Sequence, residues 1–372
     1  IESSPGHRTV GQGRQESLGQ RTVLGCRRPK IRLEPRKSDN QTMTDLLIFE
    51  ESLASIAGVL KDFPQLRVVC WQAGGRMTID GQPVAANDVT PEIGWISFNL
   101  LVSGQMKPYV DTLLQFHSLR WVQSTHAGLD NPAYRQLAQK GVRLSKSYAQ
   151  SIPIAEYVLA HALHHFQGIE FRLEAQRAAD WKGFRFRELY GTRWLIVGFG
   201  HIGRRVAERA RAFNCHITTL RRSGIPDAAA DEIVSRDGLL HVLGQSDVVV
   251  LACPENQETR GIVDTKFVRA MKVGSLLVNV ARGGLIDDQA LLEGLAAGRP
   301  SSAVLDTFND EPLPGDHPYW SHPGVVVTAH TSNAGEGTAG RSCQQFIGNL
   351  ERYLTGEPLG DEVDPASLLK TS

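Results

Sequence analysis

Residues 194–222 constrain the fold more than any other part of the chain. A short apolar run at 194–197 leads into a glycine turn, Gly-Phe-Gly-His-Ile-Gly, and then into a helix-like segment. A dinucleotide site requires this order of strand, glycine turn and helix start. Gly198 permits the tight turn, Gly200 lets the backbone approach a pyrophosphate, and Gly203 lets the helix pack closely on the strand. The sequence therefore predicts a nucleotide site in an α/β domain.

The end of the next strand predicts which nucleotide is bound. Residues 216–220 form that strand, and an NAD site would carry a carboxylate directly after it. Arg221, Arg222 and Ser223 stand there instead. Two guanidiniums and a hydroxyl suit a phosphate monoester, so we expect NADP(H) in preference to NAD(H). The cofactor-binding residues predicted from these two motifs are Gly198, Gly200, His201, Ile202, Gly203, Arg221, Arg222 and Ser223.

The composition excludes several other classes of function. The chain has 372 residues, with 40 basic and 40 acidic side chains, so nothing indicates a nucleic-acid or membrane-surface partner. No window of about 18 apolar residues predicts a membrane span. The five cysteines are scattered and never spaced as CxxC. This pattern favours free thiols in a reducing, cytoplasmic compartment and gives no support for a metal site.

The first 42 residues are rich in Arg, Gln, Ser and Gly and lack apolar periodicity, so we expect them to be disordered. They also lack the apolar core of a secretory signal. Met43 resembles a natural start, which leaves upstream translation, an expression artefact or a transit peptide as the origin of the preceding segment.

From Met43 on, short apolar runs alternate with amphipathic helical stretches. This pattern predicts an α/β fold with two doubly wound parallel-sheet domains. A long helix from Ile154 toward Trp181 lies between the two series, and a final amphipathic helix covers about 337–354. The predicted strands are 46–49, 66–71, 93–98, 119–123 and 142–144 in the first series, and 194–197, 216–220, 248–252, 275–280, 302–305 and 325–328 in the second.

Arg282, Glu311 and His330 each follow one of three late strands. In open parallel sheets, ligands bind beyond the carboxyl ends of the strands. These residue types suit hydride transfer between a nicotinamide and a 2-keto or 2-hydroxy acid. The imidazole would act as acid or base, the carboxylate would stabilise the imidazolium and hold its orientation, and the guanidinium would bind the substrate carboxylate. Each residue also has an ordinary structural alternative, as a strand-end histidine, a turn-capping arginine or part of a polar loop.

Six motifs lie between Met43 and the end of the chain: LIVGFGHIG at 195–203, NVARGGLID at 279–287, LDTFNDEP at 305–312, VTAH at 327–330, WVQSTHAGLD at 121–130 and IAEYVL at 154–159. In combination they resemble the D-isomer-specific 2-hydroxyacid dehydrogenase family. The resemblance implies Arg282 as the substrate-carboxylate ligand, Glu311 as the partner of His330, and His330 as the acid/base. It also implies that backbone amides in one loop hold the substrate carboxylate, namely those of Thr125, His126, Ala127 and Gly128. The resemblance also implies five further cofactor-binding residues, namely Cys253, Pro254, Val280, Ala281 and Asp306.

The resemblance further implies the domain organisation and the assembly. A Rossmann nucleotide domain at 151–331 would be inserted into a flavodoxin-like substrate domain made of 43–150 and 332–372. Asp306 would bond the nicotinamide carboxamide. Hinge closure over the substrate is expected, as is a homodimer formed through the nucleotide domain.

The chain departs from the family pattern around the catalytic histidine and in the cofactor site. Ala329 replaces the usual proline, and Asn333 replaces a glycine, which asparagine can mimic because it tolerates the left-handed conformation. The sequence ACPEN at 252–256 replaces the usual HVPLT. Glu311 argues against a formate dehydrogenase, which carries glutamine at this position.

The leading functional prediction is NADPH-dependent reduction of a small 2-keto acid, glyoxylate or hydroxypyruvate first, to the D-2-hydroxy acid, with NAD(H) as the alternative cofactor. An NAD(P)-dependent dehydrogenase of a bulkier 2-hydroxy acid or of phosphoglycerate is the alternative within this class. A corepressor-like scaffold that senses NAD(P) is the alternative from another class.

Overall fold

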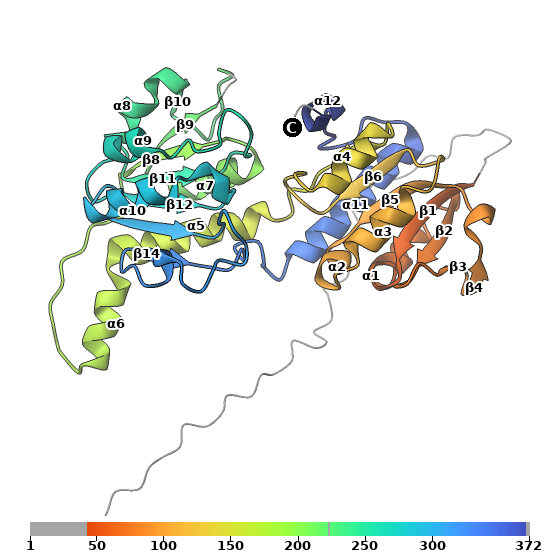
Figure 1. Cartoon of the computed structure of the whole chain (residues 1–372), viewed down its shortest axis with the longest axis horizontal. Coiled ribbons are helices and arrows are strands. Elements are labelled where there is room, and N and C mark those ends of the chain that lie inside the picture. Colours follow the sequence, from red (N-terminus) through yellow and green to blue (C-terminus); the bar gives the residue numbers. More distant parts are fainter. Residues whose placement is uncertain (1–42, 222–223, 370–372) are drawn as a thin grey trace, which may run out of the picture.

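A computed structural model describes residues 43–221 and 224–369 and places them in two α/β domains that lie side by side (Figure 1). The disorder expected for residues 1–42 and the predicted phosphate ligands Arg222 and Ser223 lie outside the described residues. Within the two described ranges, no helix combines the length and apolar character that crossing a membrane requires.

The first sheet has seven strands in the order β4-β3-β2-β1-β5-β6-β7. Five of them are parallel and repeat the flavodoxin-like order: β1 (Thr44–Phe49), β2 (Leu66–Trp71), β5 (Pro91–Ile96), β6 (Trp121–Ser124) and β7 (Arg143–Ser145). The other two, β3 (Met77–Ile79) and β4 (Gln82–Val84), form an antiparallel hairpin at one edge. The sheet is therefore mixed, whereas the sequence predicted parallel strands only. The missed signal is the Asp80-Gly81 turn, whose φ values of 49° and 78° are typical of a two-residue hairpin loop.

Helices from both ends of the chain cover the first sheet. They are α1 (Glu50–Leu60), α2 (Phe98–Val102), α3 (Met106–Leu113), α4 (Pro132–Gln139), α11 (Thr338–Thr355) and α12 (Pro365–Leu369). Helix α11 returns from the far end of the chain, and its Phe346 ring stacks on Trp95 with 4.5 Å between ring centroids. Ile347 and Leu350 of the same helix share a core cluster with β1. Figure 1 shows α11, in blue, inside the domain built by the N-terminal strands.

The second sheet is parallel throughout, in the order β10-β9-β8-β11-β12-β13-β14. This is the Rossmann order with one strand added, and it confirms the predicted nucleotide fold. The strands are β8 (Arg193–Val197), β9 (His216–Leu220), β10 (Glu232–Val234), β11 (Val248–Leu251), β12 (Leu276–Asn279), β13 (Ser302–Leu305) and β14 (Val325–Val327). The central strands are apolar and buried along their length because helices cover both faces. One face carries α5 (Ser151–Gln167) and α7 (His201–Arg211), and the other carries α8 (Leu239–Leu243), α9 (Thr265–Ala270) and α10 (Asp288–Ala296).

The long helix predicted toward Trp181 is two helices in the structure. Helix α5 ends at Gly168, whose φ of 58° gives the left-handed cap that glycine adopts without strain. Helix α6 (Ile169–Arg177) follows with no buried residue, and Figure 1 shows it projecting away from its domain. The sequence pattern missed this break because the second helix packs too little to leave an apolar stripe.

Candidate active site

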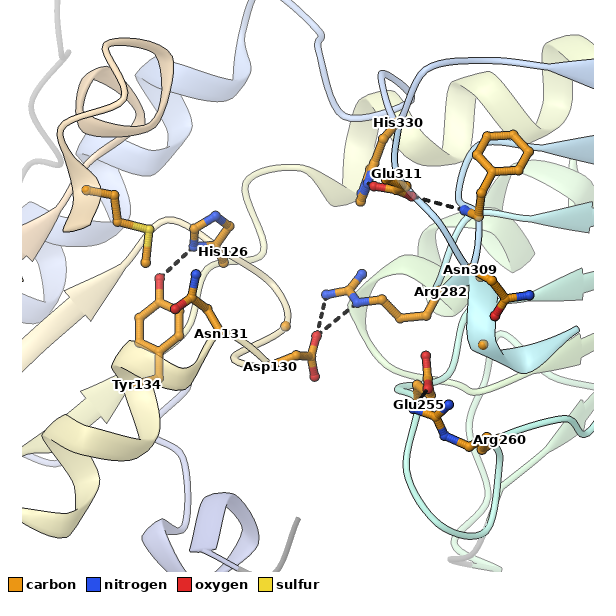
Figure 2. Close-up of a pocket in the computed structure, with 15 residues that line it drawn as sticks. His126, Asp130, Asn131, Tyr134, Glu255, Arg260, Arg282, Asn309, Glu311 and His330 are labelled. Carbon is orange, nitrogen blue, oxygen red and sulfur yellow. Dashed lines mark hydrogen bonds and ion pairs between the residues drawn. The ribbon is translucent and has the colours of Figure 1, made fainter. Parts of the chain in front are cut away.

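A cavity of about 470 Å³ lies between the two domains, where the carboxyl ends of the parallel strands meet. Five residues predicted from the sequence line it (Figure 2): His126, Gly128, Arg282, Glu311 and His330. They come from four loops that are far apart in the chain. The structure therefore brings together the predicted anion ligand, acid/base and carboxylate in one site.

Arg282 lies in the turn after β12, and its neighbours hold that turn in place. Asn279, the last residue of the strand, donates from Nδ2 to the Arg282 carbonyl at 2.9 Å and accepts from the Ala281 N–H at 3.1 Å. A Cβ on Gly283 would lie 1.9 Å from the carbonyl carbon of Phe308, so only glycine lets the turn pack on the loop after β13. These contacts direct the guanidinium into the cavity.

Asp130, on the opposite wall, pairs with Arg282 across the gap between the domains (Figure 2). Its Oδ2 accepts from Arg282 Nε at 2.9 Å and from Nη2 at 2.7 Å. A Cβ on Gly128 would lie 2.2 Å from Nη2, so the absence of a side chain there allows the approach. A carboxylate of the protein thus occupies two donors of the predicted substrate ligand. Sequence reasoning did not identify Asp130 as a site residue, although it ends the WVQSTHAGLD motif.

His330 and Glu311 form a pair at the wall of the nucleotide domain. His330 Nδ1 lies 2.9 Å from Glu311 Oε2, and the Phe308 N–H donates to Glu311 Oε1 at 3.0 Å. The carboxylate therefore has one oxygen fixed by backbone and the other on the imidazole. The backbone of His330 has the left-handed conformation, with φ of 53°. Asn333, which the sequence suggested for that conformation, does not have a positive φ.

Asp306 holds the loop that carries His330. Its side chain is fully buried, and Oδ1 accepts from the Thr328 hydroxyl at 2.6 Å and from the Thr331 N–H at 2.9 Å. The Ser332 N–H donates to Oδ2 at 3.1 Å. A left-handed non-glycine residue costs about 1–2 kcal/mol, and these bonds on both sides of His330 offset that cost. In this structure Asp306 binds its own chain at the position predicted to face the nicotinamide.

His126 forms the opposite wall, on the loop between β6 and α4. The Asn131 side chain caps α4 by accepting from the Ala133 N–H at 3.0 Å, and Pro132 is the first residue of the helix. This cap fixes the point at which the loop that carries His126 ends. Burial, with the nearby Arg282 charge, lowers the pKa of His126 to about 4. Its ring is therefore neutral at physiological pH.

A family model described as "D-isomer specific 2-hydroxyacid dehydrogenase, NAD binding domain" matches residues 159–332. An uncharacterized protein of Corynebacterium melassecola is 32% identical over 257 residues, which cover 66% of this chain and 83% of that protein. A solved D-isomer-specific 2-hydroxyacid dehydrogenase family protein from Aeromonas salmonicida is 28% identical. That structure covers 87% of this chain and 99% of its own, with a TM-score of 0.70.

The chain belongs to the D-isomer-specific 2-hydroxyacid dehydrogenase family. It is an NAD(P)-dependent enzyme of that family, as the sequence predicted. Two further relatives differ in what they act on. A glyoxylate/hydroxypyruvate reductase of Arabidopsis thaliana is 28% identical over 65% of this chain and 77% of its own length. A D-3-phosphoglycerate dehydrogenase of Methanocaldococcus jannaschii is 30% identical over 69% of this chain, which spans half of that protein's length.

The dehydrogenase offers a fitting cradle for the dinucleotide at the start of α7. A Cβ on Gly200 would meet nothing within 4 Å, so the backbone there is open to a ligand, while a Cβ on Gly203 would lie 2.2 Å from the Gly198 carbonyl oxygen. Free N–H groups at this helix start suit a pyrophosphate. His201, the first helical residue, bonds Asp361 through Nε2 at 2.7 Å.

A second cavity, also of about 470 Å³, adjoins the cradle and suits an adenosine. Gly198, Arg221, Cys253 and Pro254, all predicted cofactor residues, line it. Arg236, which the sequence analysis did not select, lines it too, and its guanidinium donates to the Glu258 carbonyl at 2.7 Å. No sequence signal marks Arg236, because it lies after an edge strand that was not predicted.

The remaining predicted residues lie behind the cavity walls or beside them. Thr125 is fully buried and its hydroxyl bonds Ser342 at 2.8 Å. Val280 and Ala281 are buried under the Arg282 turn, and Ile202 packs partly buried on the core. Ala127 lines a neighbouring cavity of about 880 Å³ that continues between the domains.

Proposed function

We propose that this dehydrogenase reduces a small, polar 2-keto acid to the D-2-hydroxy acid with NADPH, glyoxylate and hydroxypyruvate being the favoured substrates. The observation that supports it most directly is the meeting of Arg282 with the His330–Glu311 pair in one cavity between the domains. An anion ligand and a proton donor that line the same cavity suit a substrate that carries a carboxylate next to its carbonyl.

The chemistry divides among three side chains. Arg282 binds the substrate carboxylate and polarises the carbonyl through its positive charge. His330 donates a proton from Nε2 to the carbonyl oxygen while Nδ1–H stays on Glu311 Oε2, so the carboxylate stabilises the charged imidazole before the transfer. The nicotinamide, when bound, supplies the hydride.

The preference for NADPH rests on the residues that follow β9. Arg221 lines the adenosine cavity, and Asp227 lies 3.9 Å from its Nη1 while pairing with Arg204 at 2.5 Å. Two solved relatives in this fold, from Xanthobacter autotrophicus and Sinorhizobium meliloti, are described as complexes with NADPH and NADP, at 24% and 21% identity and TM-scores of 0.70 and 0.67. They cover 87% of this chain and 99% of their own lengths.

The double variant Arg221→Asp, Arg222→Ala tests the preference. We expect its ratio of kcat/KM for NADPH over NADH to fall by at least about tenfold, since hydrogen bonds to a charged group contribute about 1.5–3 kcal/mol. Arg205→Ala, which removes an exposed arginine of α7 in the same domain, is the matched control. An unchanged ratio in the double variant would remove the basis for NADPH.

The lining of the active-site cavity supports a small polar substrate. Of its side chains only Met106 and Phe308 are aliphatic or simple aromatic groups, and the rest are charged, polar or absent. A bulky apolar keto acid would leave these polar groups desolvated without partners. The alternative, a phosphorylated hydroxy acid, is favoured by one observation: Arg135, Lys146 and Arg260 line the neighbouring cavity.

A substrate panel with NADPH decides between these functions. It contains glyoxylate, hydroxypyruvate, pyruvate, 3-phosphohydroxypyruvate and phenylpyruvate. We expect the highest kcat/KM for one of the first two, and preference for the phosphorylated acid would establish the alternative. His330→Ala should abolish turnover and leave nucleotide binding intact. No turnover of any of these keto acids by the wild type would refute the proposed function.

Domain closure and dimerisation are part of the same proposal. We place the boundaries of the substrate domain at 43–150 and 332–372. His126 then belongs to the substrate domain and Arg282 to the nucleotide domain, and closure would bring these two sides of the cavity closer together. For the homodimer we propose the segment around α6, where Trp181 is fully exposed and Phe184, Phe186 and Tyr190 are 40–66% exposed. Trp181→Asp should convert a dimer into monomers in sedimentation experiments. A wild-type monomer would refute this part alone.

A further inference from the structure

A closed set of hydrogen bonds links Ser124, Tyr134 and His126 behind the substrate-domain wall of the active site. The Tyr134 hydroxyl lies 2.7 Å from Ser124 Oγ and 2.5 Å from His126 Nδ1. The backbone N–H of His126 donates to Ser124 Oγ at 2.9 Å. Ser124 and Tyr134 are fully buried, so water does not compete for these groups.

Counting the protons in this set assigns the tautomer of His126. Ser124 Oγ accepts from the backbone, and its own proton has one neighbouring acceptor among the described residues, the Tyr134 oxygen. Tyr134 must then donate its proton to His126 Nδ1. The opposite direction would leave the buried Ser124 hydroxyl proton without an acceptor, which is unfavourable where no water can replace it. Nδ1 is therefore the acceptor, and the proton of the neutral ring sits on Nε2.

The Nε2–H group belongs to the wall that faces Arg282. His126 lines the active-site cavity, and Figure 2 shows its ring and the His330–Glu311 pair on opposite sides of that space. In the described part of the chain, no group forms a hydrogen bond with Nε2. Burial keeps the ring neutral, as its pKa of about 4 indicates. The site thus holds an uncharged donor with a fixed direction.

We propose that His126 Nε2–H donates to an oxygen on C3 of the substrate, and that it selects 2-keto acids with a hydroxyl there over those with a methyl. This inference rests on the proposed function. The Thr125 N–H donates to the Ile96 carbonyl at 3.0 Å and the His126 N–H to Ser124 Oγ, so of the four predicted loop amides those of Ala127 and Gly128 would join Arg282 on the carboxylate. His330 would take the carbonyl oxygen, so the C3 substituent is the part of a three-carbon acid left to meet this donor. A methyl group would bury the N–H without a partner, and a site built to bond a hydroxyl rejects the analogue that lacks it.

Kinetics with hydroxypyruvate, pyruvate and glyoxylate test the proposal. His126→Phe keeps a ring and removes the donor, so we expect kcat/KM for hydroxypyruvate to fall about 10- to 100-fold. Glyoxylate, which has no C3 atom, should change by less than about threefold on the same reasoning. Pyruvate should gain activity, because the variant no longer leaves an N–H without a partner beside its methyl group. His126→Gln returns an N–H donor and should restore part of the preference. His117→Phe, an exposed histidine of the same domain, is the matched control.

The tautomer is tested without any turnover. Long-range ¹H–¹⁵N spectra of histidine-labelled protein, assigned by comparison with His126→Phe, should show a neutral ring protonated at Nε2. Tyr134→Phe removes the proton that Nδ1 accepts and should abolish this fixed state while lowering the preference for hydroxypyruvate.

Two results would overturn the proposal and leave the proposed function standing. Equal losses for all three substrates in His126→Phe would place the ring on the shared carboxylate or in the fold. A proton found on Nδ1 would show that the donor direction is reversed. Absence of turnover of every keto acid by the wild type would instead refute the proposed function, and the proposal with it.

Discussion

The two glycines of the nucleotide turn make the sharpest prediction, because an added methyl group meets opposite surroundings at each. A Cβ on Gly203 would lie 2.2 Å from the Gly198 carbonyl oxygen and 3.1 Å from Ile196 Cγ2. Real Cβ atoms do not come this close to backbone, so α7 would have to move away from β8. A Cβ on Gly200 would meet nothing within 4 Å, and its φ of −82° suits any residue.

The magnitude follows from these contacts. Overpacking a buried site costs about 1–3 kcal/mol, and the fixed backbone carbonyl places Gly203→Ala at the upper end. Alanine regains about 1 kcal/mol of helix propensity over glycine. We therefore expect Gly203→Ala to lower the free energy of unfolding by about 2 kcal/mol. Gly200→Ala should leave it unchanged within about 0.5 kcal/mol, the range of ordinary exposed substitutions.

The same pair separates stability from binding. In Gly200→Ala the methyl group occupies the space through which a pyrophosphate would approach the helix start, so the Kd for NADPH should rise at least about tenfold, or 1.4 kcal/mol. Urea unfolding without ligand gives the first quantity, and quenching of protein fluorescence by NADPH gives the second. A stable Gly203→Ala would refute the packing argument. A Gly200→Ala protein that binds NADPH like the wild type would refute the placement of the pyrophosphate.

Three further predictions concern the active site. Glu311→Gln keeps the acceptor for the Phe308 N–H but removes the negative charge beside His330. Both side chains of the pair are about 40% exposed, so we expect kcat to fall only about tenfold and NADPH binding to stay unchanged. An unchanged kcat would contradict the role assigned to Glu311. Asp130→Asn weakens the pair that competes for Arg282, so KM for the keto acid should fall about two- to fivefold, whereas a rise would show that Asp130 orients the guanidinium for substrate. In the folded protein His126 has a pKa of about 4, whereas in the unfolded chain it titrates near its ordinary value of about 6.5. Between these two pH values the unfolded state binds more protons, so the free energy of unfolding should drop by about 3 kcal/mol as pH falls. Urea midpoints of His126→Phe that decline as steeply as those of the wild type would contradict this.

Strand positions were predictable because they depend on local pattern. The strand at 302–305 and those at 66–71 and 216–220 match the structure to the residue, since parallel strands covered on both faces read as short runs rich in apolar and β-branched residues. The hairpin around Asp80 was missed because each of its strands has three residues, too few for a period to appear. The break at Gly168 was missed for the related reason that α6 buries nothing.

The sequence by itself determined the α/β fold and the nucleotide turn, and it selected Arg282, Glu311 and His330 as candidates that the structure places in one cavity, because strand ends in such sheets lie on one edge whatever else the chain does. Only the tertiary structure decided that Asp130 meets Arg282 and that Tyr134 orients His126. These contacts depend on how two domains and several loops approach each other in space. Distances of a few ångströms between distant residues leave no period or motif in the chain, and those distances decide which proton sits on which atom.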